Sequence, residues 1–223
     1  MRRIIIWFWI LFIFACWNGL AHADSITLFS GNGDNGGTDP YTLFSASGTN
    51  SLSTMDSAVI NNTYPTPSLE AYIGSEGTGI YQIPGSKVIN SIPHSYYYGV
   101  SGYYERTFIL PSLFTTATLE LDAVGDDEGY AYLNRQFLGY FGWKNDGAYS
   151  LGTSDLNFFS TGENKLTFVV SNSGGGPTGL SYKATVSYEP VPQPTTVLLL
   201  GSGLFGLAGL RRKLLKISLL PSA

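Results

Sequence analysis

Apolar and polar residues alternate along several segments in the middle of the chain. Three segments show this alternation over six residues or more: 118–123, 165–170 and 180–188. A period of two places the apolar side chains on one face of a β-strand, so each segment is expected to bury one face. Clusters rich in Gly, Ser, Asp and Asn separate these segments, at 125–129, 160–164 and 171–179. This spacing of strands and turns is typical of an antiparallel sandwich and not of alternating strands and helices.

The alternating region extends from residue 24 to residue 190 and contains no amphipathic helix of twelve residues or more. About eight to ten strands fit into this length, which is enough to bury a core without disulfide bonds. The pattern therefore predicts an all-β domain, a jelly-roll-like antiparallel β-sandwich.

The N-terminal segment has the pattern of a signal peptide. Two arginines precede an uninterrupted apolar run at 4–17, and Ala21 and Ala23 stand at the −3 and −1 positions before Asp24. This arrangement predicts cleavage by signal peptidase between Ala23 and Asp24. Fourteen apolar residues are fewer than the ~20 that span a bilayer, so a retained transmembrane helix is the weaker alternative. A lipoprotein signal ending at Cys16 is a second alternative.

The C-terminal segment combines prolines, an apolar run and basic residues. Pro192 and Pro194 form a stiff spacer, residues 195–210 carry no charge, and Arg211 and Arg212 follow directly. A helix over this run is roughly 24 Å long, somewhat shorter than the ~30 Å hydrocarbon core, and snorkelling arginines can close the difference. The run predicts a thin transmembrane helix at about 195–210 whose basic end stays in the cytoplasm.

These C-terminal features resemble the PEP-CTERM sorting signal of Gram-negative bacteria that make exopolysaccharide. The matching features are Pro192 and Pro194, the short Gly-rich apolar helix, and the Arg211–Arg212 end. The resemblance implies that an exosortase, a membrane protease, removes the tail after the inner membrane has held it. Gln193 stands where the family has Glu, so permanent anchoring is an alternative to processing, and an unrelated tail-anchored helix is another.

Charge is distributed unevenly along the chain. Of the 12 basic residues, two precede the first apolar run and four follow the last, which leaves 6 basic against 16 acidic residues, or −10, in the middle. This excess of acid argues against a nucleic-acid partner, and it favours a neutral over an anionic polysaccharide as ligand. Residues 24–190 contain no cysteine and a single histidine, so thiol chemistry and a multi-histidine zinc site are excluded there.

Residues 104–188 resemble the galactose-binding-like β-sandwich of many carbohydrate-binding modules. The resemblance rests on an acidic turn followed by a strand that ends in Asn134, and on the two alternating segments nearest the domain's end. Arg135 replaces the glycine that usually follows this Asn, and this replacement favours a different turn. The resemblance implies an architecture more than a function, because the fold also occurs in modules without sugar affinity.

A Gly-flanked stretch at 139–147 has the composition of a sugar-binding loop. It contains Tyr140, Trp143, Asn145 and Asp146. Aromatic faces stack on sugar rings, and amide and carboxylate oxygens accept their hydroxyl hydrogens. The sequence therefore predicts carbohydrate binding at these four residues, and the alternative is that Trp143 caps the core.

Two acidic, Gly-rich loops could hold structural calcium, which prefers carboxylate and carbonyl oxygens. One loop contains Asp34 and Asp39, and the other contains Asp126 and Asp127. Neither has the EF-hand spacing, and a solvated turn is the alternative for both. No other cofactor is expected.

Together these features predict three parts with different roles. These parts are a signal peptide at 1–23, a β-sandwich domain at 24–190 and a sorting signal at 191–223. The predicted protein is exported, membrane-anchored until processed, and then located at the cell surface or outside the cell. Its predicted function is non-catalytic association with exopolysaccharide or the envelope. An envelope hydrolase that uses paired carboxylates is the alternative, followed by a purely structural or protein-binding role.

Overall fold

The computed structural model describes residues 23–74, 79–91 and 100–191 of the 223-residue chain. Contacts divide the chain into two units, of which Ala23–Pro190 is one. This unit contains the described fold, with eleven strands and two short helices. The strands are β1 Asp24–Phe29, β2 Thr38–Ala46, β3 Leu69–Ile73, β4 Ile89–Asn90, β5 Gly102–Leu110, β6 Phe114–Asp126, β7 Glu128–Leu133, β8 Gln136–Gly142, β9 Tyr149–Thr153, β10 Gly162–Ser171 and β11 Gly179–Pro190. The helices are α2 Leu52–Ile60 and the 3₁₀ turn η1 Leu156–Phe158.

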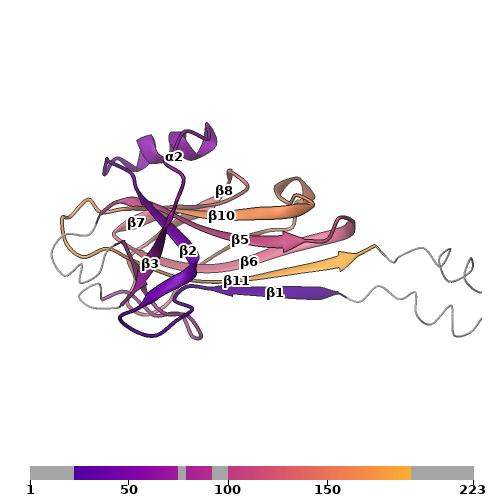
Figure 1. The fold of residues 1–223 in the computed structure, drawn as a ribbon, viewed down its shortest axis with the longest axis horizontal. Helices are drawn as coiled ribbons and strands as arrows, with labels where there is room; N and C mark the ends of the chain where they lie inside the picture. Colours follow the sequence, from indigo (N-terminus) through magenta and orange to yellow (C-terminus); the bar gives the residue numbers. More distant parts are fainter. Residues whose placement is uncertain (1–22, 75–78, 92–99, 192–223) are drawn as a thin grey trace, which may run out of the picture. The chain divides into compact units, whose positions relative to one another are not determined.

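All the strands join in one antiparallel sheet that folds over on itself as a sandwich (Figure 1). The strand order is β8-β7-β10-β5-β2-β3-β4-β11-β6-β9, and β1 pairs with β11. β8, β7, β10, β5 and β2 form the first layer, and β4, β11, β6, β9 and β1 form the second. Two short turns connect strands of different layers: residues 111–113 between β5 and β6, and Asp127 between β6 and β7.

The two chain ends of the domain leave from the same end of the sandwich. Asp24 is opposite Tyr188 in the β1–β11 ladder, and Pro190 is opposite Phe114. The loops after β6, β8 and β10 lie at the other end, on the left in Figure 1. The long β11–β6 ladder connects these two ends of the domain.

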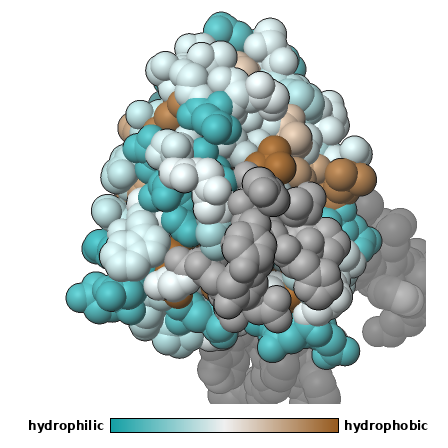
Figure 2. All heavy atoms as spheres, turned by 90° about the vertical axis from the view of Figure 1, so that its left-hand side faces the viewer, coloured by the Kyte–Doolittle hydropathy of each residue, from teal (hydrophilic) through white to brown (hydrophobic). Residues whose placement is uncertain are grey.

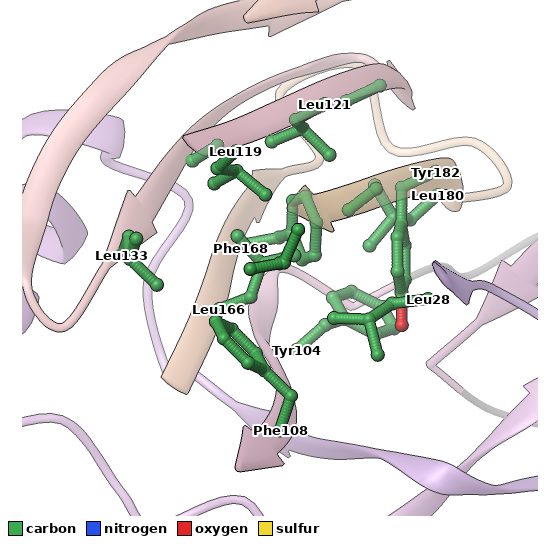
Figure 3. Packing of buried hydrophobic residues seen from close by; sticks show 14 of the residues in the cluster. Leu28, Tyr104, Phe108, Leu119, Leu121, Leu133, Leu166, Phe168, Leu180 and Tyr182 are labelled. Atoms are coloured by element: carbon green, nitrogen blue, oxygen red, sulfur yellow. The ribbon is translucent and has the colours of Figure 1, made fainter. Parts of the chain in front are cut away.

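The core fills the space between the layers with the apolar side chains of the alternating segments. Phe168 of β10 stacks on Tyr182 of β11, with ring centroids 4.5 Å apart, and so joins the two layers. Leu119 and Leu121 of β6 point toward Phe168 from the second layer (Figure 3). These buried positions are the ones that the period-two pattern assigns to the inner face, so the all-β antiparallel prediction is confirmed.

Helix α2 covers part of the outer face of the first layer. Its side chains Met55 and Val59 are fully buried against Tyr103, Tyr132 and Val169 of β5, β7 and β10. The hydroxyl of Ser51 caps the helix by accepting a hydrogen bond from the backbone N–H of Thr54. With nine residues the helix is too short to give a clear amphipathic signal in the sequence.

The turn between β7 and β8 corrects one expectation from the sequence. Asn134 and Arg135 form a two-residue loop with φ values of 50° and 68°. This is the left-handed geometry of the turn that Asn-Gly favours, so the expectation of a different turn at Arg135 is wrong. The Asn134 side chain explains why the turn persists, because it bonds to the Lys165 backbone N–H, the Phe158 carbonyl and the Asn164 side chain.

Candidate functional site

Five aromatic side chains lie side by side on β7, β8 and β9. We call this group the aromatic row: Tyr132, Phe137, Tyr130, Tyr140 and Tyr149. Phe137 is 51% exposed and Tyr140 is 45% exposed, whereas Tyr132 is buried under α2. The row therefore begins beneath the helix and extends into solvent.

The rings of the row contact one another mainly edge to face. Ring centroids are 5.4 Å apart for Tyr130–Phe137 and 5.9 Å apart for Tyr140–Tyr149, with interplanar angles of 89° and 87°. This T-shaped geometry places the positive ring edge on the negative ring face, which stabilises the pair. Neighbouring rings of the row are therefore steeply inclined to one another.

Glycines beneath the row explain how its strands pack so closely. The ring of Phe141 points inward from β8 and occupies the space where a side chain at Gly125 or Gly129 would lie. Phe141 is fully buried and contacts Phe168 edge to face at 6.0 Å. Phe141 therefore anchors β8, and with it the exposed side of the row, to the core.

Gly142 has a comparable role on the exposed side. A Cβ atom at this position would lie 2.8 Å from the hydroxyl of Tyr140. The Tyr140 side chain therefore extends along its own strand over Gly142. Its position depends on the absence of a side chain there.

Polar groups border the row at its outer end. Lys144 Nζ lies 4.2 Å from the centroid of the Tyr149 ring and donates a hydrogen bond to the Ala148 carbonyl. Burial, followed by the charge of Glu128, raises the pKa of Tyr140, so its hydroxyl remains a donor at neutral pH. A cation, a carboxylate and several hydroxyls thus lie next to the apolar rings.

The predicted sugar-binding residues are only partly brought together. Tyr140 belongs to the aromatic row, and Trp143 lies three residues later with 49% of its surface exposed. Asn145 and Asp146 are exposed in the same loop, which is held in place by the backbone bond from Tyr81 N–H to the Lys144 carbonyl. Figure 2 views the end of the sandwich opposite to the chain ends, where the coloured surface is mainly hydrophilic and its hydrophobic atoms form small groups.

The adjacent acids Asp126 and Asp127 have different environments at the turn between β6 and β7. Asp126 is buried, and burial together with the hydrogen bond and charge of Asp127 raises its pKa to about 7. Asp127 Oδ2 accepts hydrogen bonds from the Gly174 N–H and the Ser173 hydroxyl at 2.8 and 3.1 Å, and its pKa is lowered. The backbone carbonyl of Asp127 accepts a hydrogen bond from the Trp143 N–H. The turn between β6 and β7 therefore also holds the start of the loop 143–148 between β8 and β9.

The other predicted calcium loop uses its buried acid for hydrogen bonds. Asp39 is fully buried; its Oδ2 accepts bonds from the Gly31 N–H and the Thr42 hydroxyl, and its Oδ1 accepts one from the Tyr41 N–H. Asp34 is exposed. No three His, Cys, Asp or Glu side chains gather into a possible metal cluster within residues 23–74, 79–91 and 100–191. Calcium binding at either loop stays a prediction.

Sequence reasoning missed Phe137, Tyr130 and Tyr149 as members of the site. Tyr130 and Tyr140 are paired across β7 and β8, and a bulge brings Phe137 opposite Tyr132. The signal available in the sequence was the run of aromatic residues on both sides of the Asn134–Arg135 turn. A hairpin places such residues next to each other across its two strands.

Comparison with solved structures yields many matches of low similarity. A family 29 carbohydrate-binding module shares 12% identity at a TM-score of 0.37, over 75% of this chain and 86% of that one. A family 35 carbohydrate-binding module from Clostridium thermocellum shares 11% identity at a TM-score of 0.37, over 72% and 97%. A β-glucuronidase from Ruminococcus gnavus shares 12% identity at a TM-score of 0.43, over 75% of this chain but only 29% of the enzyme. At this level of similarity these structures indicate no function for the chain.

No curated protein matches the sequence. Several predicted targeting residues lie outside the described residues: Ala21, Pro192, Gln193, Pro194, Arg211 and Arg212, together with the predicted helix at 195–210. Ala23 and Asp24 are described, and Asp24 begins β1. In the part of the chain that the structure describes, no helix has the length and hydropathy to cross a membrane.

The C-terminal segment matches a known targeting motif. Residues 190–213 match the PEP-CTERM protein-sorting motif, which confirms the sorting signal expected from the proline spacer, the apolar run and the basic end. This motif implies export, anchoring by the tail and subsequent processing. The chain carries a PEP-CTERM sorting signal on an all-β domain and is an exported, sorted protein.

Proposed function

We propose that the exported domain binds a neutral polysaccharide of the cell envelope or exopolysaccharide without cleaving it. The observation that carries this proposal is the aromatic row, in which Phe137 and Tyr140 expose about half of their surface. Sugar rings have apolar C–H faces and polar edges. Sugar rings therefore suit a surface where exposed aromatic rings lie beside hydroxyl, ammonium and carboxylate groups.

The charge of the domain supports a neutral ligand. Its 16 acidic and 6 basic residues give −10, which repels polyanions unless cations intervene. Lys144 is the basic residue that contacts the row, and its ammonium lies over the Tyr149 ring. The row thus offers stacking and hydrogen bonding more than it offers charge pairing.

Hydrolysis is the second candidate, and the divergent pKa values of Asp126 and Asp127 favour it. One carboxyl group kept protonated beside one kept ionised has the form of an acid and a nucleophile. Glycosidases, however, separate their two carboxyl groups by at least about 5 Å so that the sugar fits between them. Asp126 and Asp127 are hydrogen-bonded to each other and are too close for this geometry.

Retention by polysaccharide tests the proposal directly. The fragment 24–190 contains the complete core and both chain ends of the compact unit, so it is suitable as a soluble probe. We expect the fragment to be slowed in gels that contain the organism's own polysaccharide, and Tyr140→Ala to lose most of the shift. One stacked ring at the centre of a site contributes about 2 kcal/mol, or roughly 30-fold in affinity.

The matched control replaces a side chain on the opposite outer face, where Thr118 is exposed on β6. Thr118→Ala is expected to bind like the parent. Equal losses in both variants, or binding by neither the parent nor the variants, would contradict the proposal. Shortening of the polysaccharide during incubation would favour the hydrolase.

Export of this domain adds a second proposal about its processing. We infer that signal peptidase cuts before Asp24 and that an exosortase removes the tail near Pro194, despite Gln193. The intact mass of the protein recovered from cells and medium tests both cuts. A C-terminus near Pro194 supports processing, whereas a full tail in every fraction means permanent anchoring.

A further inference from the structure

Exposed apolar side chains also gather at the end of the sandwich from which the sorting tail leaves. The turn between β5 and β6 has the sequence Ile109-Leu110-Pro111-Ser112-Leu113, and we call it the aliphatic turn. Ile109 is 71% exposed and Leu113 is 65% exposed, the two largest exposed fractions among the described large apolar residues. Leu110 between them is buried in the core, which fixes the turn to the domain.

The register of the sheet places this turn beside the exit of the tail. Phe114, which follows the turn directly, is opposite Pro190, the last residue of β11. The Thr115 hydroxyl also bonds to the Glu189 carbonyl across the same two strands. The chain therefore leaves the domain next to Leu113.

The length of the connecting segment limits how far this end can lie from a membrane. Only residues 191–194 separate Pro190 from the apolar run that begins at Thr195. Four fully extended residues span at most about 14 Å. When the tail is inserted, the aliphatic turn must therefore lie near the bilayer surface.

We propose that the aliphatic turn docks into the interfacial layer of the bilayer that holds the sorting tail. Ile109 and Leu113 remove apolar surface from water on docking, and the tail supplies a high effective concentration that makes a small contact sufficient. Glu163, which is opposite Ile109, and Glu189 are both exposed at this end. Their charge selects zwitterionic over anionic lipid as the partner surface.

A lipid-quenching experiment tests this contact in the full chain. Cys16 is the only cysteine, so Cys16→Ser with Leu113→Cys gives a single position for an environment-sensitive fluorophore. The protein is anchored through its tail in phosphatidylcholine vesicles with and without a quencher on the lipid chains. The matched control is Leu69→Cys on β3, where the native side chain is 63% exposed. In the sheet Leu69 lies opposite Phe44, far from the turn.

We expect several-fold stronger quenching at position 113 than at position 69. Adding Ile109→Ser distinguishes docking of the turn from its closeness to the membrane through the tail. This substitution leaves the connection to the tail unchanged and removes one of the two exposed apolar side chains. A several-fold loss of quenching with Ile109→Ser supports docking. Thermal unfolding of that variant should match the parent, because the side chain is exposed.

Three outcomes of the quenching experiment with lipid would overturn the proposal. These are equal quenching at positions 113 and 69, quenching at 113 that Ile109→Ser does not reduce, and quenching that requires anionic lipid. A fluorescence shift at 113 that grows with protein concentration in the absence of lipid would assign the turn to contact with a second copy and would likewise overturn it.

Discussion

The two outer faces of the sandwich differ in chemistry although the inner faces are alike. Outward positions of β1, β6 and β11 carry mainly hydroxyl side chains, which we call the hydroxyl face: Ser25, Thr27, Thr116, Thr118, Thr185 and Ser187. Outward positions of β7 and β8 carry four rings of the aromatic row, and α2 covers Tyr132 and the strands beside it. Inward positions on both layers are Leu, Val, Ala, Phe and Tyr, as core packing requires.

The hydroxyl face is what folding of a β-sandwich requires, whereas the exposed aromatic rings are not. Short hydroxyl side chains are well solvated and suit the exposed face of a strand, so the hydroxyl face is explained by solubility and β-propensity alone. Half-exposed Phe137 and Tyr140 leave apolar surface in water, which folding does not favour. Contiguous exposed aromatics of this kind support the binding surface that we propose.

The largest expected effect comes from removing the anchor beneath the aromatic row. Phe141→Ala should lower the free energy of unfolding by about 3–5 kcal/mol, because a fully buried ring between two glycines leaves a cavity that the backbone cannot fill. Urea unfolding of fragment 24–190 measures this loss. Polysaccharide binding should fall as well, because β8 loses its attachment to Phe168.

Leu121 is a buried residue beneath the hydroxyl face and corresponds to Phe141 beneath the aromatic row. Leu121→Ala removes a buried side chain on β6, whose outward neighbour is Glu120, and should cost about 2–5 kcal/mol without changing binding by the folded protein. If both variants weaken binding equally, the aromatic row is not a distinct functional region.

Asp126 lies at the turn that connects β6 of one layer to β7 of the other. Since the folded protein holds the proton of Asp126 up to a pKa of about 7, against 3.8 for an unperturbed Asp, the free energy of unfolding should fall as pH rises from about 4 to about 7. Asp126→Asn removes the charge. The free energy of unfolding of this variant should exceed that of the parent by about 2–4 kcal/mol at pH 8 and should equal it near pH 4.

Urea unfolding at pH 4, 6 and 8 gives the profile for both proteins. Glu163→Gln, at an exposed position of β10, is the control and should leave the profile of the parent unchanged. A parent protein that is more stable at pH 8 than at pH 5, with no gain from Asp126→Asn, would contradict the environment assigned to this acid.

The hydroxyl face and its core were predictable from sequence in a way that the aromatic row was not. Alternation at 118–123 and 180–188 identifies the inward apolar residues of β6 and β11 directly, although Ser181 on the other side of β11 is buried as well. On β8 the alternation fails, because Phe137, Leu138, Tyr140 and Phe141 are all apolar or aromatic. The hydropathy pattern of β8 therefore could not distinguish its inward from its outward residues.

Register explains the rest of what sequence reasoning missed. The extra residue of the bulge is Leu138 of β8, which sets which ring of β8 lies opposite which ring of β7. Gly139 beside it is a sequence signal for a bulge, but it does not specify the register of the rings. Tyr149 joins the row only because the folded sheet brings β9 beside β8. Tyr140 and Trp143 are both exposed, as the composition of the 139–147 stretch predicted, but Tyr140 lies in strand β8 and not in a loop.

The third prediction moves one ring of the row without removing it. Gly142→Ala places a methyl group where the Tyr140 hydroxyl lies, and the flexible end of that side chain must shift. Affinity for polysaccharide should fall by about fivefold, or about 1 kcal/mol, with little change in unfolding free energy. Gly147→Ala, in the loop that follows β8, is the control, because a Cβ atom there meets no atom within 4 Å. Equal affinities for the two variants would remove Tyr140 from the site.

The smallest effect is expected at the turn of the hairpin that carries the row. Arg135 has a φ of 68°, which costs energy for a residue with a Cβ, so Arg135→Gly should raise the free energy of unfolding by about 0.5–1 kcal/mol. Asn134→Gly is the matched comparison, because φ is also positive there but the side chain bonds to three partners. That variant should lose stability, since the buried partners are left unsatisfied. Opposite signs for these two neighbouring substitutions in urea unfolding would show that Asn134 holds the hairpin through its side chain while Arg135 only tolerates the turn. Loss of stability in both would mean that the turn is not strained at Arg135.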